Sequence, residues 1–305
     1  MDFSAAIGAA KVNLFVTAGG DFSGRLTWLN LGQLNVLRAQ ESLPRIGFVS
    51  FPPNQAIISF PAGRWSSLTY CGSCLHFGDI VFHGHGECAH QRTEEAAIWG
   101  LISLPLGLLA SCSKALTGKS IRPPSEGQVI RPARDAARAL LRLCSGAWHL
   151  AETRRELIAN PEVARALEQE LLRVLIHCLA TGHIDESKRR QRHTDIMVRF
   201  EEALVAQGAP RLKLSKLCNA TDVPERTLRL CCTEFLGMSP TRYYQLRRLN
   251  MARSALQLAN PETASVAAIA RDHHFLELGR FAVTYRALFG EMPSSTLRRH
   301  RTGVD

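Results

Sequence analysis

The chain has 305 residues, 46% of them hydrophobic, so it exceeds the usual size of one domain and can bury a core in each of two. Its formal net charge of +10 favours polyanionic partners such as DNA, RNA or an acidic membrane, without choosing among them. The nine cysteines are odd in number and scattered through apolar stretches. This excludes the framework of a small disulfide-stapled domain and fits a reducing cytoplasm.

The beginning of the chain does not predict secretion. Asp2 and Lys11 interrupt the stretch where a secretory signal needs a basic start followed by an unbroken apolar run. The longest apolar run, 96–110, contains Gly100 and Pro105 and is too short to cross a bilayer. We therefore expect a cytoplasmic protein without membrane contact.

Residues 22–105 form short runs in which apolar and polar side chains alternate, separated by Gly, Pro and Asn. Leu26 and Trp28 illustrate the period of two, and Pro52 with Pro53 illustrates the breaks. Repeated short strands with such turns are typical of a β-sandwich or a small barrel. The pattern predicts an α+β protein that begins with a β-rich, cupin-like domain over residues 1–130.

One cluster in this domain holds side chains of the kind that bind metals: Cys71, Cys74, His76, His83, His85, Glu87, Cys88 and His90. On a strand, His83 and His85 would share a face, and sites with two histidines and one carboxylate for iron are built from such parts. Glu87 lies too near to be the acidic ligand, and a second CxxC pair is absent. We predict no metal site; metal or redox sensing through His83, His85 and His90 is the alternative.

Helical periodicity begins near residue 132. Apolar side chains recur at helical spacing over 136–141 and again over 163–179, which predicts two amphipathic helices in the segment 131–183. Their stripes are expected to form domain core, with a dimer interface as the alternative. The charged run 185–193 that follows has no apolar residue, so 184–193 is predicted to be a linker rather than a localisation signal or a phosphate-contacting arm.

The segment 194–302 predicts an all-α domain, opened by an amphipathic helix over 194–206, with a first helix-turn-helix unit. The elements of this unit are a helix over 214–220, a turn at 222–225 and a second helix over 226–235, closed by Gly237. Pro224 stands at a helix start, where a missing N–H costs nothing. Arg226 and Arg229 open the second helix and could pair bidentately with guanine in the major groove.

The same scheme then returns as a second unit. Its elements are a connecting helix over 241–258, a short helix over 266–270, a turn at 272–275 and a second helix over 277–289, closed by Gly290; a final helix from 292 carries Arg298, Arg299 and Arg301. A connecting helix of this length spans ~27 Å, close to the ~34 Å repeat of DNA. The two units could therefore enter successive major grooves, and one chain could recognise a bipartite site.

Residues in both units match one family at fixed spacings. The first unit matches at Leu217, 225–228, Gly237 and 239–240, and the second at 248–249, Ala252, Val266, 269–270, Phe275, 279–281, 285–286, 289–290 and Pro293. Through these residues, about a third of the chain resembles the DNA-binding domain of the AraC/XylS family of transcription regulators. The resemblance implies binding to double-stranded DNA, and an N-terminal domain that binds a small effector or mediates association.

The chain departs from the family pattern at three places. His274 stands where the family usually has Gly before the Phe that ends the second turn, which predicts a strained positive φ. Cys232 replaces an aromatic in the middle of the first unit's second helix. Gly279, Ala282 and Val283 lie where polar contacts are common, so Arg280 is expected to be the main base or phosphate contact of the second unit.

The predicted DNA-contacting residues lie on the second helix of each unit and on the connecting helix: Glu225, Arg226, Thr227, Arg229, Leu230, Thr233, Gly279, Arg280, Ala282, Val283, Arg286, Arg242 and Arg247. The arginines at 242, 247, 248, 286 and 298 are expected at phosphates, which fix register without reading sequence. Trp28, Phe48 and Phe60 could line an effector pocket, although plain core positions explain them as well.

We predict a transcription regulator of the activator type, with no catalytic residue and no cofactor. Its expected partners are double-stranded DNA, a small effector and a second copy of the chain, with RNA polymerase as a further candidate. The alternative is a metal-dependent cupin enzyme, or a metal or redox sensor, fused to the DNA-binding module.

Overall fold

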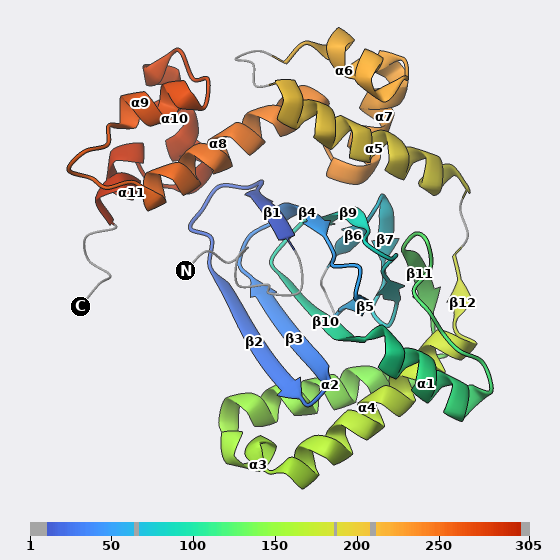
Figure 1. Cartoon of the computed structure of the whole chain (residues 1–305). Coiled ribbons are helices and arrows are strands. Elements are labelled where there is room, and N and C mark those ends of the chain that lie inside the picture. The colour runs from blue at the N-terminus through green and yellow to red at the C-terminus, as the bar shows by residue number, and fades with distance from the viewer. Residues whose placement is uncertain (1–10, 64–66, 186–187, 208–211, 300–305) are drawn as a thin grey trace.

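The computed structural model describes residues 11–63, 67–185, 188–207 and 212–299 (Figure 1). Two antiparallel sheets face each other in the N-terminal half; helices cover the outer face of one, and the C-terminal helices lie over the other. Within this part of the chain, no helix is long and apolar enough to cross a membrane. The predicted α+β class is confirmed, with a β-rich N-terminal and a helical C-terminal part.

The two sheets are built from short strands. The smaller sheet has the order β1-β4-β9-β6-β7, with bounds β1 Lys11–Val16, β4 Arg45–Ser50, β9 Cys88–Thr93, β6 Leu68–Tyr70 and β7 Ser73–Leu75. The larger sheet has the order β12-β11-β8-β5-β10-β3-β2, with bounds β12 His183–Ile184, β11 Gln128–Arg131, β8 Ile80–Phe82, β5 Gln55–Pro61, β10 Ala97–Pro105, β3 Leu34–Glu41 and β2 Gly24–Leu31. Leu101 packs between the sheets, whereas its neighbour Ile102 packs on the outer face, because successive side chains of a strand alternate.

Helices cover the outer face of the larger sheet. They are α1 Leu106–Thr117, α2 Arg134–Thr153, α3 Arg155–Ala159 and α4 Pro161–Thr181. Trp148 of α2 stacks on Phe60 of β5 with ring centroids 6.3 Å apart, and Leu175 of α4 is fully buried in the same cluster. Most of the predicted apolar stripe of α4 therefore forms domain core, and only Val163, at 37% exposure, stays in solvent.

The C-terminal part consists of helices alone. They are α5 Lys188–Gln207, α6 Leu214–Thr221, α7 Glu225–Leu236, α8 Pro240–Leu258, α9 Val266–Asp272, α10 Leu278–Phe289 and α11 Pro293–Arg299. The first unit, α6 and α7, packs against α5 and the first half of α8. The second unit, α9 and α10, has its own core with the second half of α8 and with α11, built around Leu249, Phe281 and Tyr285. The long helix α8 is thus shared by both units.

The smaller sheet packs directly against α5, α7 and α8. Phe15 of β1 meets Tyr243 of α8 edge to face at 5.8 Å. Asn250 of α8 clamps the backbone of Val16: its Oδ1 accepts from the Val16 N–H at 3.0 Å, and its Nδ2 donates to the Val16 carbonyl at 3.2 Å. One apolar cluster therefore continues from the interior of the β-domain into the first unit.

Several elements differ from the predictions, among them β11, β12 and α3, which were not predicted. The strand β1 precedes the predicted β region, and α1 was missed because the apolar run 96–110 joins the strand β10 to this helix at Pro105. Helix α5 begins at Lys188, not at 194, since Lys, Arg and Gln in the charged run are good helix formers. The predicted domain boundaries stay predictions.

Candidate DNA interface

The first unit places α7 by a tight turn after α6. Asp222 closes α6 with a left-handed φ of 54°, and Pro224 is the N-cap of α7, as its position in the sequence predicts. Leu228, Cys231 and Phe235 anchor α7 in the core, and Gly237 ends it with φ 71°. The opposite face of the helix is left in solvent.

The second unit repeats this arrangement, but different residues hold its turn in place. His274 has φ 62°, so the positive φ predicted from the missing glycine is confirmed. Arg248 of α8 holds the turn. It donates from Nε to the His273 carbonyl at 2.9 Å and from Nη2 to the His274 carbonyl, and its guanidinium carbon lies 4.2 Å from the Phe275 ring centroid. Arg248 is partly buried and holds the turn, so its guanidinium has a structural role there.

We call α7 and α10 the reading helices. Both end at a glycine in the left-handed region, Gly237 and Gly290, and counting back from these glycines aligns the two helices. Leu228 and Phe281 are then equivalent and both buried, and Cys232 takes the place that Tyr285 fills in the second unit. The alignment shows that both helices turn the same side toward the core, and so the same side toward solvent.

The structure brings most of the predicted contact residues onto these exposed faces. On α7 the exposed residues are Glu225, Arg226, Arg229, Leu230 and Thr233, with Thr227 partly exposed. On α10 they are Gly279, Arg280, Val283 and Arg286, with Ala282 partly exposed. Arg242 at the start of α8 is exposed as well. These residues are therefore accessible to solvent.

The basic side chains of the reading helices are held loosely. Arg229 pairs with Glu225 one turn earlier at 2.7 Å, and Arg280 pairs with Glu277 at 3.3 Å. All four side chains are about half exposed or more. Such exposed pairs contribute ~0–1 kcal/mol, so a phosphate or a guanine can replace the carboxylate at little cost.

Arg247 does not fit its predicted role at a phosphate. Its side chain is 10% exposed, forms an ion pair with Glu201 of α5 and lies 5.6 Å from the ring centroid of Phe15 in β1. Its partners come from two distant segments of the chain, α5 and β1, which helical spacing does not reveal. Arg247 links the β-domain to the connecting helix instead.

Glu201 is the centre of a buried network between the two halves of the chain. Its Oε1 lies 3.0 Å from Nε2 of His90 in β9 and accepts from the Tyr243 hydroxyl at 2.5 Å, while Oε2 accepts from Arg247. Burial alone would raise the pKa of the Glu201 carboxyl, but the hydrogen bond and charge of His90 and the charge of Arg247 hold it below its usual value. The network therefore keeps a carboxylate charged inside the interface.

The histidines that could have formed a metal site do not converge. His83 lies 2.8 Å from the Ser59 hydroxyl and 3.4 Å from Glu87, His85 is exposed, and His90 belongs to the Glu201 network. The strand β8 ends before His83, so the expected shared face does not exist. No three metal-binding side chains among the described residues are grouped to hold an ion. The metal alternative is therefore not favoured.

The two cysteines of the CxxC pair, Cys71 and Cys74, lie in different environments. Cys71 is buried, and burial together with the charge of Glu87 raises the pKa of its thiol to about 12. Cys74 is exposed on β7, and both cysteines are free. A thiol with so high a pKa is unreactive at neutral pH, so Cys71 is a core residue.

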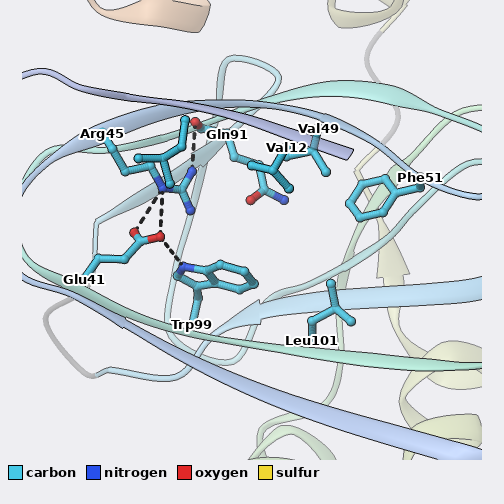
Figure 2. A pocket seen from close by; sticks show the side chains of 9 residues that line it. Val12, Glu41, Arg45, Val49, Phe51, Gln91, Trp99 and Leu101 are labelled. Carbon is cyan, nitrogen blue, oxygen red and sulfur yellow. Dashed lines mark hydrogen bonds and ion pairs between the residues drawn. The ribbon is translucent and has the colours of Figure 1, made fainter. Parts of the chain in front are cut away.

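A small cavity lies between the two sheets (Figure 2). One end is polar: Arg45 donates from Nε to both oxygens of Glu41 at 3.0 and 3.1 Å, and Trp99 donates from Nε1 to Glu41 at 3.0 Å. The other lining residues are mainly apolar, among them Val12, Leu14, Val49, Phe51 and Leu101. The free volume is about 10 Å³, enough for about one water molecule.

None of the three aromatic candidates for an effector pocket lines this cavity. Phe60 packs on the outer face of the larger sheet, and Phe48 lies against His90 with ring centroids 4.8 Å apart. Trp28 is 39% exposed and borders an open cleft of about 530 Å³ between β2 and the helices α2 and α3. The polar lining by Glu41, Arg45 and Trp99 was missed, because nothing in the local sequence marks these residues as buried.

Comparison with known proteins identifies a helix-turn-helix domain in the C-terminal part. A family model described as a helix-turn-helix domain matches residues 217–299. The XylDLEGF operon transcriptional activator 2 of Pseudomonas putida is 34% identical over 105 residues, which cover 34% of this chain and 65% of that protein. The XylDLEGF operon transcriptional activator of the same organism is 36% identical over 93 residues, covering 30% of this chain and 29% of its own length.

Two solved structures align with the chain, both with a TM-score below 0.5. The AraC-like transcriptional activator CuxR aligns over 97% of this chain and 93% of its own, at 14% identity and a TM-score of 0.43. A probable AraC family transcriptional regulator from Rhodopseudomonas palustris is 30% identical and aligns over 35% of this chain and 97% of its own, with a TM-score of 0.31.

Proposed function

We propose, from the premise that residues 217–299 are a helix-turn-helix domain of the AraC/XylS type, that the chain is a transcription regulator that binds DNA sequence-specifically. The observation that carries the proposal is the repeat itself: two reading helices, aligned at their closing glycines, leave equivalent faces in solvent. A general polyanion binder needs positive charge alone and has no use for such a repeat.

The exposed arginines divide into two roles in this proposal. Arg226 and Arg229 at the start of α7 read base edges in one major groove, where a bidentate contact to guanine is worth about 1–3 kcal/mol of discrimination. Arg280 and Arg286 of α10 and Arg242 of α8 contact bases or phosphates of the same site. Arg247 and Arg248 are left out, since both are held inside the protein.

The helix α8 sets the distance between the reading helices. Its 19 residues span ~28 Å. The second turn is fixed to α8 through Arg248, and α7 joins α8 through the short turn at Gly237, so the spacing is rigid. We place the reading helices in successive major grooves on one face of the duplex, about 34 Å apart, with DNA bending or tilt of the helices taking up the difference.

The β-domain is the proposed sensor. A small effector would enter the space between the sheets beside Glu41, Arg45 and Trp99, and the present volume requires the sheets to open first. A second copy of the chain would associate through the helical side of the β-domain, where Leu157 and Val163 are exposed. In this role the protein acts in the bacterial cytoplasm, with RNA polymerase as a further partner at the promoter. None of its residues is assigned a catalytic role.

The test is selection of genomic DNA fragments by the purified chain at a fixed ~150 mM salt with excess competitor DNA, because phosphate contacts alone depend on salt. We expect a recurring bipartite motif, relaxed over one half by Arg226→Ala plus Arg229→Ala. The matched control is Arg134→Ala plus Arg138→Ala, two exposed arginines of α2 on the opposite side of the molecule, which should leave the motif unchanged (Figure 1). Recovery of random fragments by all three proteins would overturn the proposal.

A further inference from the structure

The exposed faces of the reading helices are not uniformly polar. Val283 of α10 is 72% exposed, and Leu230 of α7 is 48% exposed. A single exposed aliphatic residue on a protein surface needs no explanation. These two residues, however, stand at the same distance before the closing glycines Gly237 and Gly290, so each is the equivalent of the other in the repeat.

Both residues lie among the side chains that face a ligand. On α7, Leu230 follows Arg226 by one helical turn, so the two side chains are neighbours on the exposed face. On α10, Val283 stands between Gly279 and Arg286, one turn from each. Gly279 has no neighbour within 4 Å of an added Cβ, so the surface beside Val283 is open.

Apolar groups in the major groove of DNA are rare. Among the four bases, thymine alone presents one there, its 5-methyl group, and aliphatic side chains pack against it. Hydrogen-bonding contacts cannot use this group, whereas a branched aliphatic side chain buries it from water. Thr284, the nearest hydroxyl on α10, donates its proton to the Arg280 carbonyl at 2.8 Å, so this proton is not available to a base.

We propose that Leu230 and Val283 are specificity-determining residues that recognise thymine methyl groups, one in each half of the bipartite site. This inference rests on the proposed function. Val283 would then read a base together with Arg280, the main candidate on α10, and the second half-site must contain a thymine. In both halves a thymine faces the same position of the repeat.

The test removes the methyl group without changing any hydrogen bond. A duplex of the selected sequence is made with deoxyuridine in place of thymidine at one position at a time, and binding of the full chain is measured at fixed salt. One substitution in each half should weaken binding about four-fold, the loss expected for one methyl group removed from an apolar contact. Val283→Ala should lose that dependence in the second half alone, and Leu230→Ala in the first half alone.

The control is Leu116→Ala, an exposed leucine at 54% on α1, far from both reading helices, which should keep the full dependence on the methyl groups (Figure 1). If no recurring motif is selected, the proposed function itself fails. If a motif is selected but deoxyuridine has no effect, or Val283→Ala stays as sensitive to it as the unaltered chain, the inference is wrong and the two residues serve another contact.

Discussion

Removal of Glu201 tests whether the β-domain is docked on the DNA-binding half of the chain. The Glu201 side chain is 3% exposed and faces His90 of β9 and both Tyr243 and Arg247 of α8. Glu201→Ala leaves Arg247 buried at 10% exposure without its carboxylate. Breaking a buried ion pair from one side costs about 3–5 kcal/mol, because an uncompensated charge remains.

Replacing both partners should cost much less. In Glu201→Leu with Arg247→Met the carboxylate and the guanidinium are removed together, so Arg247 leaves no unpaired charge. Replacing a buried ion pair by apolar side chains of similar volume is often neutral for stability. The double variant should therefore be more stable than Glu201→Ala, although His90 and Tyr243 lose their partner.

The assay is urea unfolding of the full chain, followed by two signals. Trp99 and Trp148 report on the β-domain by fluorescence, and far-ultraviolet circular dichroism follows the helices. We expect Glu201→Ala to lower the unfolding midpoint in both signals, since the network joins both halves. A change below about 1 kcal/mol would mean that Glu201 is solvated and that the two halves are not docked in solution.

Three further predictions concern pH and the strained turns. The pKa of Glu201 is lower in the folded chain than in the unfolded one, so its contribution to the free energy of unfolding is complete above the unfolded pKa and is lost as pH falls through the folded pKa. Glu201→Gln should therefore lose less stability than the unaltered chain when the pH is lowered below about 4.5. His274→Gly should raise the thermal midpoint or leave it unchanged, since it relieves a φ of 62°, whereas His274→Val should lower it by several degrees. Gly237→Ala and Gly290→Ala should each cost about 1 kcal/mol because both glycines have a positive φ, and Gly237→Ala should cost somewhat more because its Cβ would lie 2.7 Å from Nη1 of Arg92, which must move; a smaller loss for Gly237→Ala than for Gly290→Ala would contradict the contact with the β-domain.

The C-terminal helices were predictable because their ends are marked locally. Pro224, Gly237 and Gly290 sit at helix ends where backbone geometry demands them, so the sequence places both units within a few residues. The strain at His274 was predictable as well, since the second turn needs a positive φ whichever residue occupies it. Reading-helix faces follow from the same periodicity.

The contacts between distant segments could not be predicted in this way. Arg247 has the spacing of an exposed helix residue, and only the meeting of α8 with α5 and β1 makes it buried. Glu41 and Arg45 likewise have the composition of a surface loop, yet both lie inside the β-domain. A charge becomes a core group only when its partner is brought to it by the fold, and a sequence pattern does not contain that information.

The most direct test of the central claim varies the spacing between the two half-sites. Binding of the full chain is compared on the selected duplex, on one with about half a helical turn inserted between the halves, and on one half-site alone. Because α8 holds the reading helices at a fixed distance on one face, we predict that the insertion reduces binding to the level of the single half-site. Equal binding to the original and the lengthened duplex would contradict a rigid pair of reading helices and the account built on it.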